Sequence, residues 1–487
     1  MLDPSVDRVP GIEELELVPL DLSDLGRVRR RTSARRLLQI TSVTGRRVLP
    51  VVLTNPFVRD RDRRKARLGR GLARGVTELG VTFVKLGQLL ASSPSIAGPT
   101  LAEAMRGVLD DGPAIPFAQV RAIVEDELGR PLDEVFASFE EAPFAAASLA
   151  VVHRATLLDG SQVAVKVLRP RSAEIVATDL SLVRPFVGWL FRAAPVGVIP
   201  VVPDTVEGLA EQLAEELDLR NEARAMRWFD EVFAAVGAKG VTVPETIPAA
   251  SGRRVLTMGY IAGSKIDDLP ALAAADVDAS AGVKALLEAW FAITLCTGTF
   301  HGDVHAGNLL LTPDGLVALL DWGIVGRLPE ASLRFFRRSL EGSLGDESAW
   351  PEVRDHILAT MPADLLAAAG LSSEDLLLLV RAQTLLIMTS PFKDLDLMLL
   401  APGAPVPGAP EGEPLPTSGL GWLRLARRER KALKAAGWPA PPSPPRGEVL
   451  LIKQLVYFER YGKLFLGDEP LIFDPDVYRA LLALTSP

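Results

Sequence analysis

The sequence of 487 residues contains very little cysteine and histidine, with a single Cys and four His. One thiol excludes an intramolecular disulfide, and this scarcity is typical of a protein from a reducing compartment. Four dispersed histidines do not supply the clustered ligands that a zinc site needs. Cys296 lies in the apolar stretch "AITLCTGTF", so we interpret it as a small buried hydrophobic residue rather than a nucleophile.

Long uncharged apolar runs and a secretory leader are also lacking. The first 21 residues are acidic and show neither a basic start nor an apolar core, which excludes a secretory signal. The most apolar candidate for a membrane span, residues 180–202, contains Arg184, Arg192 and three prolines. Charges and prolines there favour a buried helix and its exit loop. We therefore expect a soluble, cytoplasmic protein.

Acidic residues outnumber basic ones and give a net charge of −8, but the charge is unevenly distributed. Residues 27–74 hold 16 Lys/Arg against two Asp, a local charge of +14, so the rest of the chain sums to −22. Such a segment fits a solvated or internally paired helical face, anionic lipid headgroups, or nucleic acid. Aromatic residues are nearly absent from it, which weighs against nucleic acid. We therefore expect peripheral contact between this segment and the inner face of an anionic membrane, and we expect no nucleic acid as a partner.

Turn residues and alternating apolar residues predict two β-hairpins in a chain that is otherwise mainly helical. The first hairpin covers 150–168 and turns at "DG" 159–160, a dipeptide typical of tight hairpin turns. The second covers 308–323, "NLLLTPDGLVALLDWG". Helical periodicity follows the first hairpin, over 172–236, and precedes the second, over 280–299. The pattern predicts small β-structures embedded among helices.

The stretch "FHGDVHAGN" at 300–308, followed by "DWG" at 321–323, has the residue types and order of a kinase catalytic loop. Phosphoryl transfer needs positioned metal ions and a carboxylate near the attacking oxygen. Asp303 is the candidate base or substrate-orienting group, while Asn308 and Asp321 are candidate ligands of Mg²⁺. Any one of them alone would more often cap a helix or close a turn. The ordered trio in this spacing favours the catalytic interpretation.

Lys166 lies in the middle of the apolar strand "VAVKV", directly after the first hairpin turn. A lysine buried there is costly unless a charge pairs with it. In a kinase, that lysine meets the α- and β-phosphates and a helix-borne glutamate. The helix predicted to run through "EELDLRNEA" offers Glu216, Asp218 and Glu222, although an exposed acidic face is the alternative. Together these residues predict a kinase-like site for ATP and Mg²⁺.

Several motifs together resemble those of the ABC1/UbiB/ADCK (AarF) group of atypical, protein-kinase-like proteins. The motifs are "FVKLGQ" at 83–88, "AAASLAVVHRA" at 145–155, "DGSQVAVKVLRP" at 159–170, "ELDLRNEA" at 216–223 and "FHGDVHAGNLLL…LLDWGIVGRL" at 300–328. The K-x-G-Q element, the alanine-rich loop and the E-x-D element are specific to this group. The resemblance covers about 75 to 395. It implies an α+β, protein-kinase-like fold with two lobes, a helical N-terminal extension and added C-terminal helices.

The resemblance also implies roles for the residues of the kinase-like site. Lys166 is expected to bind phosphates and to pair with Glu222. Asp303 is expected to be the catalytic-loop carboxylate, and Asn308 and Asp321 to ligate the metal. The cofactors that follow are ATP and Mg²⁺.

Further elements of the resemblance concern access to this site. Lys85 and Gln88 would belong to an extension that folds over the active site and limits access by protein substrates. Glu216 and Asp218 would be polar partners of that extension near the nucleotide. The loop that covers the phosphates would be lined by Ala145, Ala146, Ala147 and Ser148. Alanine lacks the freedom of glycine at positive φ, so this loop should be stiffer than that of ordinary protein kinases.

The chain is predicted to divide into six parts. They are a flexible tail (1–26), an N-terminal helical extension with the K-x-G-Q motif (27–125), a kinase-like N-lobe with inserted helices (126–262), a kinase-like C-lobe (263–400), a Pro/Gly-rich linker with a basic helix (401–446) and a C-terminal helical segment (447–487). The linker prediction rests on proline and glycine content.

The function implied by the resemblance is that of an ATP-binding, Mg²⁺-dependent atypical kinase or ATPase that supports isoprenoid quinone or lipid metabolism. One alternative is a small-molecule phosphotransferase of the aminoglycoside or choline kinase type, which shares the "HGD-x-x-x-x-N" and "LDW"-like elements present at 301–322. That class has no K-x-G-Q extension, so "FVKLGQ" counts against it. The other alternative is a nucleotide-binding scaffold in which Lys85 blocks turnover.

Overall fold

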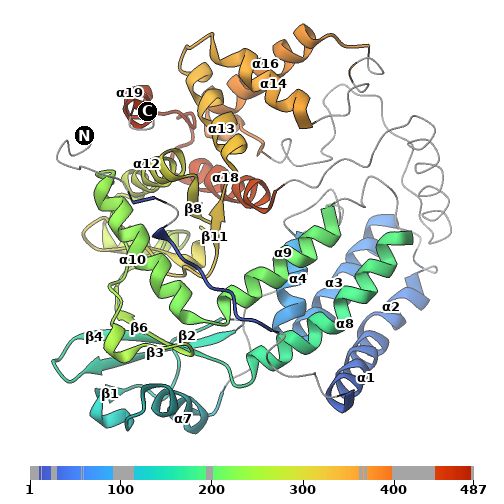
Figure 1. Ribbon diagram of the computed structural model, residues 1–487, viewed down its shortest axis with the longest axis vertical. Helices are drawn as coiled ribbons and strands as arrows, with labels where there is room; N and C mark the ends of the chain where they lie inside the picture. Colours follow the sequence, from blue (N-terminus) through green and yellow to red (C-terminus); the bar gives the residue numbers. More distant parts are fainter. Residues whose placement is uncertain are drawn as a thin grey trace.

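The computed structural model describes residues 10–11, 14–22, 30–55, 58, 60–91, 115–147, 149–193, 201–360, 366, 370–397 and 445–483. Along the chain, N-terminal helices come first, followed by a small lobe with a β-sheet, a mainly helical lobe, and two helices near the C-terminus (Figure 1). The predicted α+β, two-lobed architecture with flanking helices is confirmed.

The small lobe is organised around one antiparallel sheet. Its strands are β1 (Phe136–Phe139), β2 (Ala145–Ala146), β3 (Ala150–Leu157), β4 (Gln162–Leu168) and β6 (Val255–Gly259). They pair in the order β1-β3-β4-β6, and β2 adds to β3. Gly160 closes the turn between β3 and β4 with a φ of +91°, a conformation that favours glycine. The hairpin predicted over 150–168 is confirmed.

The alternation of side chains along β4 decides what faces the other lobe. The valines of β4 pack with α7 (Phe117–Leu128) in one hydrophobic cluster. Lys166 has the opposite parity and lies level with Val152 of β3 and Leu256 of β6. The strand therefore buries its valines against α7 and turns Lys166 toward the helical lobe.

Three helices follow the β3–β4 hairpin: α8 (Ser172–Ala193), α9 (Val201–Glu216) and α10 (Leu219–Ala235). The single helix predicted through 215–223 is wrong, because the chain is extended at Asp218. The Asp218 carboxylate accepts a hydrogen bond from the backbone N–H of Arg220 at 3.1 Å and so caps α10. An aspartate in this role favours the start of a new helix over continuation of the old one. Glu216 thus ends one helix, and Glu222 lies in the first turn of the next.

The structure differs from the expectation of a buried helix in the apolar stretch 180–202. This segment is helical to Ala193, but Ser181, Arg184 and Pro185 are exposed, so it is not a buried helix over that part. Its expected exit loop, 194–200, lies outside the described residues. Within the described part of the chain one helix, α12 (Ala279–Thr297), is long and apolar enough to cross a membrane, and 61% of its apolar window is buried within the protein. A core helix passes the same test, and α12 occupies the core of the helical lobe.

Two short sheets position the catalytic loop in the helical lobe. The first consists of β5 (Val241–Thr242), β7 (Ser264–Lys265), β9 (Leu309–Leu311) and β10 (Val317–Leu319), and the second of β8 (Thr299–His301) and β11 (Val325–Arg327). Strands β9 and β10 pair antiparallel with Leu309 opposite Leu319, which confirms the hairpin predicted over 308–323. The hairpin returns the chain so that Asn308 and Asp321 lie at the same end of the sheet.

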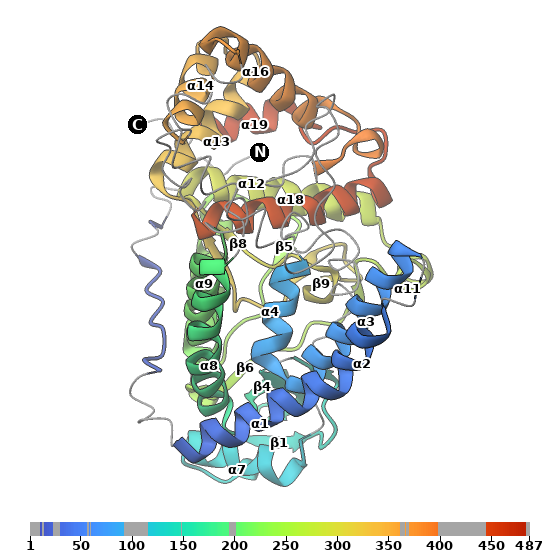
Figure 2. The ribbon, with the colours of Figure 1, turned by 90° about the vertical axis from the view of Figure 1, so that its right-hand side faces the viewer.

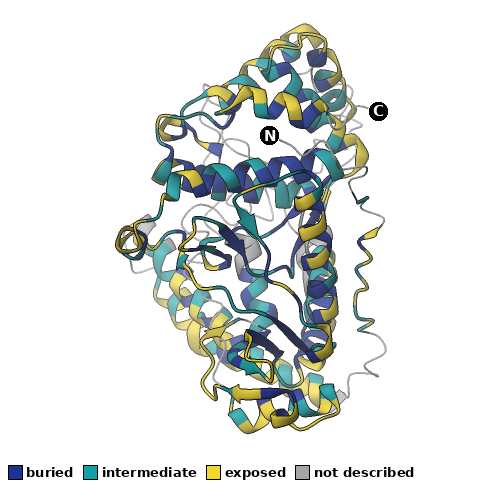
Figure 3. Ribbon diagram, turned by 90° about the vertical axis from the view of Figure 1, so that its left-hand side faces the viewer, coloured by how far each residue is buried: buried dark blue, intermediate teal, exposed yellow. Residues whose placement is uncertain are grey.

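Further helices surround this centre: α11 (Leu269–Ala275), α13 (Glu330–Ser343), α14 (Ala349–Thr360), α16 (Ser373–Thr389), α18 (Arg446–Phe465) and α19 (Pro475–Ala483). Helices α18 and α19 pack on α12, so the C-terminal segment returns to the core (Figure 2). One large hydrophobic cluster joins both lobes with these two helices. Buried residues concentrate in the inner strands and central helices, and exposed residues on the outer helices (Figure 3). The predicted linker over 401–446 lies outside the described residues, except for 445–446.

The N-terminal helices are α1 (Arg30–Arg47), α2 (Leu49–Thr54), α3 (Arg61–Leu79) and α4 (Val81–Ala91). Helix α1 packs on α8, and α4 packs on α3, α8 and α9 (Figure 2). An ion pair fastens α1 to the body, because Arg36 donates from Nε and Nη2 to the two carboxylate oxygens of buried Asp179, at 2.6 and 2.8 Å. The N-terminal extension is therefore attached to α8 and α9, the helices that follow the β3–β4 hairpin.

Part of the expected tail is bound to the body of the protein. Leu15 is buried in the main hydrophobic cluster. Val18 exchanges two hydrogen bonds of 2.9 Å with the side-chain amide of Asn221, in the first turn of α10. The expectation of a flexible tail over 1–26 does not hold for 14–22, which run along α10 and α9 as an extended ribbon (Figure 1).

Candidate active site

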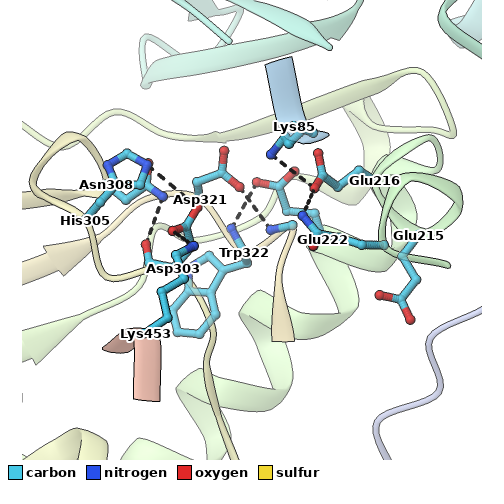
Figure 4. Close-up of polar contacts among 12 residues, drawn as sticks. Lys85, Glu215, Glu216, Glu222, Asp303, His305, Asn308, Asp321, Trp322 and Lys453 are labelled. Carbon is cyan, nitrogen blue, oxygen red and sulfur yellow. Dashed lines mark hydrogen bonds and ion pairs between the residues drawn. The ribbon is translucent and has the colours of Figure 1, made fainter. Parts of the chain in front are cut away.

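Lys166 of β4 lies at the centre of the site and joins two carboxylates that come from different parts of the chain. Its Nζ lies 2.8 Å from both carboxylate oxygens of Glu222, on α10, and 3.0 Å from Oδ2 of Asp321, which follows β10. Lys166 and Glu222 are buried, whereas 37% of the Asp321 side chain is exposed. The partly exposed carboxylate of Asp321 (Figure 4) therefore lies beside the buried ammonium group of Lys166.

Burial and charge act on these three groups in different directions. Burial alone would lower the pKa of Lys166, but Asp321 and Glu222 raise it above its usual value, so the ammonium group stays charged. Burial raises the pKa of Glu222 to about 7 against the opposing effect of Lys166. Burial acts in the same sense on Asp321, but Lys166 and the N–H of Gly323 hold its pKa well below the usual range. Asp321 therefore stays ionised and suited to bind a cation.

The D-W-G turn after β10 is fixed by backbone hydrogen bonds and by aromatic packing. The N–H of Gly323 donates to Oδ1 of Asp321 at 3.0 Å, and the N–H of Trp322 donates to Oε1 of Glu222 at 3.2 Å. The Trp322 ring is buried, with its centroid 4.4 Å from that of Phe229 on α10. The position of Asp321 thus depends on the helix that carries Glu222.

Asp303 and Asn308 lie on the other side of Asp321 and are held by contacts within the catalytic loop (Figure 4). Nδ2 of Asn308 donates to the carbonyl of Asp303 at 3.1 Å, and the N–H of Asp303 donates to Nδ1 of His301 at 3.1 Å. Burial lowers the pKa of His301 to about 4, so its ring is a neutral acceptor at pH 7. Nε2 of His305 lies 3.7 Å from Oδ2 of Asp303. The first two contacts hold the backbone of Asp303, and His305 lies beside its carboxylate.

Lys453, which the sequence reasoning missed, completes the surroundings of the catalytic loop. It projects from α18, and its Nζ lies 2.7 Å from Oδ1 of Asp303. The next residue, Gln454, is fully buried, accepts a hydrogen bond from the N–H of Val304 at 2.9 Å and donates to the carbonyl of Gly302 at 2.7 Å. The available signal was this Lys-Gln pair within an apolar helix, because buried polar side chains need partners.

The N-terminal extension contributes Lys85 from α4. Its Nζ lies 3.2 Å from Oε1 of Glu216, which also accepts a hydrogen bond from Nε2 of Gln212 at 2.7 Å. Burial raises the pKa of Glu216, and Lys85 opposes this effect. Lys85 also contributes to the lowered pKa values of Asp303 and Asp321. The structure therefore brings Lys85 and Glu216 into the site, whereas the side chain of Gln88 lies outside the described part of the chain.

Asp218 has a supporting position beside the site. Its buried carboxylate caps α10 and pairs with Arg220, whose Nη2 lies 2.5 Å away. Its contacts hold the first turn of the helix that carries Glu222. The structure thus places Asp218 at the start of the helix that carries Glu222 rather than beside Lys85.

The alanine-rich loop pairs with β3, the neighbour of the strand β4 that carries Lys166. Ala145 and Ala146 form β2, with Ala145 paired to Val152 of β3, and Val152 is level with Lys166 on β4. The carbonyl of Ala147 accepts a hydrogen bond from Nε of Arg169 at 3.2 Å. The loop is therefore tied to the sheet as far as Ala147, and Ser148 lies outside the described residues.

The donor set at the site fits a magnesium ion. Among the residues that the structure describes, no three or more His, Cys, Asp or Glu side chains are arranged to hold a metal. Asp321 supplies a partly exposed carboxylate. The side-chain N–H of Asn308 donates to the Asp303 carbonyl, so the side-chain oxygen of Asn308 points away from that carbonyl. Two hard oxygen donors suit Mg²⁺, which takes its remaining ligands from phosphates and water.

Known proteins are similar to this chain over much of its length. The model of the ABC1 atypical kinase-like domain matches residues 107–348. A chloroplastic aarF domain-containing protein kinase of Arabidopsis thaliana is 31% identical over 419 residues, which cover 81% of this chain and 72% of that protein. The chain belongs to the ABC1/UbiB (AarF) family of atypical kinases.

Bacterial members of the family are similar over much of this ABC1 protein. An uncharacterised protein of Mycobacterium tuberculosis is 35% identical over 401 residues, covering 82% of this chain and 75% of its own length. A probable protein kinase UbiB of Marinobacter nauticus is 33% identical over 306 residues, covering 59% of this chain and 56% of its own. The matched ABC1 domain, 107–348, contains neither Lys85 nor Lys453. Both lysines therefore reach the site from outside the kinase-like domain.

Proposed function

We propose that this ABC1-family protein binds ATP together with Mg²⁺ and either transfers or hydrolyses its γ-phosphate. The observation that carries the proposal is the contact of Lys166 with both Glu222 and Asp321. These contacts bring the buried ammonium group of Lys166, which suits phosphate, next to the partly exposed carboxylate of Asp321, which suits a metal. The loop that carries Asp303 lies beside them. Phosphoryl transfer depends mainly on such positioned charges.

Each residue has a defined task in the proposed reaction. Lys166 binds the α- and β-phosphates, and Asp321 and Asn308 hold Mg²⁺, which neutralises charge on the phosphate oxygens when it is bound. Asp303 accepts the proton of the acceptor hydroxyl. As that oxygen bonds to the γ-phosphorus, the bond from the phosphorus to ADP breaks, and ADP leaves. The acceptor is water for an ATPase and an alcohol for a kinase.

The N-terminal extension supports a restricted choice of acceptor. Lys85 and Glu216 form an ion pair in which only 15% and 12% of the side chains are exposed, so α4 covers the site at this point. A helix seated there obstructs a polypeptide more than it obstructs water or a small molecule. Protein substrates are therefore disfavoured, and a role in isoprenoid quinone or lipid metabolism, as implied by the resemblance to the family, fits this arrangement.

The basic helices support peripheral contact with an anionic membrane. Helices α1 and α2 expose several large apolar side chains: Leu37 by 53%, Leu38 by 72%, Leu49 by 51%, Val52 by 49% and Leu53 by 62%. Some arginines in the basic segment 27–74 are paired internally, as Arg36 is with Asp179. Exposed leucines flanked by arginines are typical of helices that lie on anionic bilayers. The proposed location is cytoplasmic, at the inner face of the membrane.

Phosphate release from Mg²⁺-ATP by the purified protein tests the proposed activity. Turnover is expected in the unmodified protein, with a loss of about a hundredfold in Asp321→Asn, because one preorganised charge at the phosphates is removed. Asp468→Asn is the matched control, since Asp468 is 87% exposed and pairs with Lys393 at the surface. Anionic liposomes are the one added variable and are expected to raise the rate. Unchanged release in Asp321→Asn would sink the assignment of the site.

A further inference from the structure

We propose that Lys453 of the C-terminal helix α18 contacts the γ-phosphate of bound ATP and is a catalytic residue of this site. The inference rests on the proposed function and extends it. It adds to the site a cation from outside the matched ABC1 domain, which ends at residue 348.

Helix α18 is fixed in register against the catalytic loop. Gln454 forms hydrogen bonds to Gly302 and Val304, the residues on either side of Asp303. Two turns further along the helix, the hydroxyl of Tyr461 donates to the carbonyl of Val304 at 2.8 Å. At the start of α18, Gly447 lies so close to the carbonyl of Arg327 that a Cβ there would be 1.9 Å from its oxygen. These contacts hold the loop without help from Lys453, so the lysine is placed precisely yet is not needed as a brace.

The ammonium group of Lys453 lies where the γ-phosphate must come. It is 2.7 Å from Oδ1 of Asp303, the carboxylate that faces the acceptor in the proposed reaction. The acceptor oxygen lies between Asp303 and the γ-phosphorus in an in-line transfer, so a cation on Asp303 is adjacent to the transferred group. The Lys453 side chain is 22% exposed, so part of it is accessible to solvent.

The other lysines of the site are engaged elsewhere. Lys166 contacts Glu222 and Asp321, and Lys85 contacts Glu216. In the proposed reaction Lys166 serves the α- and β-phosphates, so among the lysines of the site Lys453 is the one placed to add to the metal's stabilisation of charge on the γ-phosphate. A buried ion pair alone contributes little net stability compared with apolar side chains of similar size. The geometry thus favours a lysine that binds Asp303 in the free protein and a phosphate oxygen when ATP is present.

Calorimetric titration with two magnesium nucleotides tests this role with a readout other than turnover. The probes are ADP and adenylyl-imidodiphosphate, an ATP analogue with a non-hydrolysable β–γ bridge, and the variants are Lys453→Met and Lys453→Arg. We expect Lys453→Met to lose about tenfold in affinity for the ATP analogue, the effect of one charge-assisted contact, with ADP affinity within about twofold of the parent. Lys453→Arg should recover most of the loss. Lys463→Met is the matched control, because Lys463 lies on the same helix and pairs with Glu459.

The possible results separate this role from the proposed function. If the parent binds neither nucleotide, the proposed function and this role both fall. If the parent binds both and Lys453→Met weakens them equally or not at all, the role of Lys453 alone is overturned.

A footprint on the unmodified protein keeps the test valid if Lys453→Met does not fold. Lysine acylation read by mass spectrometry should show that the ATP analogue protects Lys453 more than ADP does, with no difference at Lys463. Equal protection of Lys453 by the two nucleotides would contradict the contact.

Discussion

Lys85 and Lys453 reach the same site from the two ends of the chain, but their supports differ. Helix α18 contributes Gln454, Phe458 and Tyr461 to the interior with no exposed surface, and two of these bond the catalytic loop. Val84 of α4 is 6% exposed and belongs to a small separate cluster with partly buried residues of α3. Val81 and Leu86 of α4 pack against the main cluster only as partly buried side chains. Elements with few buried contacts open at lower free energy than the core. We therefore expect α4, which carries Lys85, to be displaced more easily than α18, which carries Lys453.

The partners of the two lysines sharpen this contrast. Lys453 binds Asp303, the carboxylate that faces the acceptor in the proposed reaction, so the loss of Lys453 should impair that reaction. Lys85 binds Glu216 at the end of α9, a residue with no direct task in the proposed transfer. Removal of Lys85 should open the site without damage to its chemistry. The two lysines are thus expected to have effects of opposite sign.

The largest expected effect is on stability, from Gln454→Leu on the α18 side. The change leaves the N–H of Val304 and the carbonyl of Gly302 buried without their partner, which should lower the free energy of unfolding by about 2–4 kcal/mol. The counterpart on the α4 side is Gln212→Leu, which removes one partly buried hydrogen bond to Glu216 and should cost about 1 kcal/mol. Urea denaturation measures both. Equal losses would mean that the two supports do not differ.

A smaller effect, on activity, is expected from Lys85→Ala. Autophosphorylation should rise several-fold as α4 ceases to cover the site. Incorporation of labelled phosphate from ATP is the measurement, with Lys463→Ala as the control. Equal incorporation in variant and parent would argue that the extension does not limit access.

The smallest expected effect concerns the surface of the N-terminal helices. Leu38→Ser should reduce the affinity for anionic liposomes about fivefold, because one partly inserted leucine contributes roughly 1 kcal/mol. Leu378→Ser is the matched control, since Leu378 on α16 is 64% exposed and Leu38 is 72% exposed. Added salt should weaken the binding. No pelleting of the parent at low salt would remove the membrane hypothesis.

The two hairpins could be predicted from the sequence because their signals are local. The Asp-Gly turn at 159–160 and the alternation of β4 fix the first hairpin, and the same parity puts Lys166 on the face opposite the valines. The D-W-G turn follows directly from the second hairpin. Short-range turn chemistry and side-chain period were sufficient for both.

The parts that were missed depend on contacts between distant residues. The ribbon at 14–22 has no periodic pattern, and Val18 meets Asn221 across 203 positions. Lys453 and Asp303 are 150 positions apart, and no spacing rule connects them. The helix break at Asp218 has a local signal, an aspartate that can cap a helix. The periodicity argument did not detect it, because Asp218 lies within a run of charged residues. Long-range pairing of this kind is set by packing, which a single sequence does not display.

Calorimetric titration of Mg²⁺-ATP into the unmodified protein and Asp321→Asn tests the central claim most directly. The account predicts binding by the parent, a loss of affinity of at least about tenfold in the variant, since a charged partner of the metal and phosphates is removed, and parent-like binding by Asp468→Asn. Equal affinity in the parent and Asp321→Asn would contradict the assignment of this site to magnesium and nucleotide.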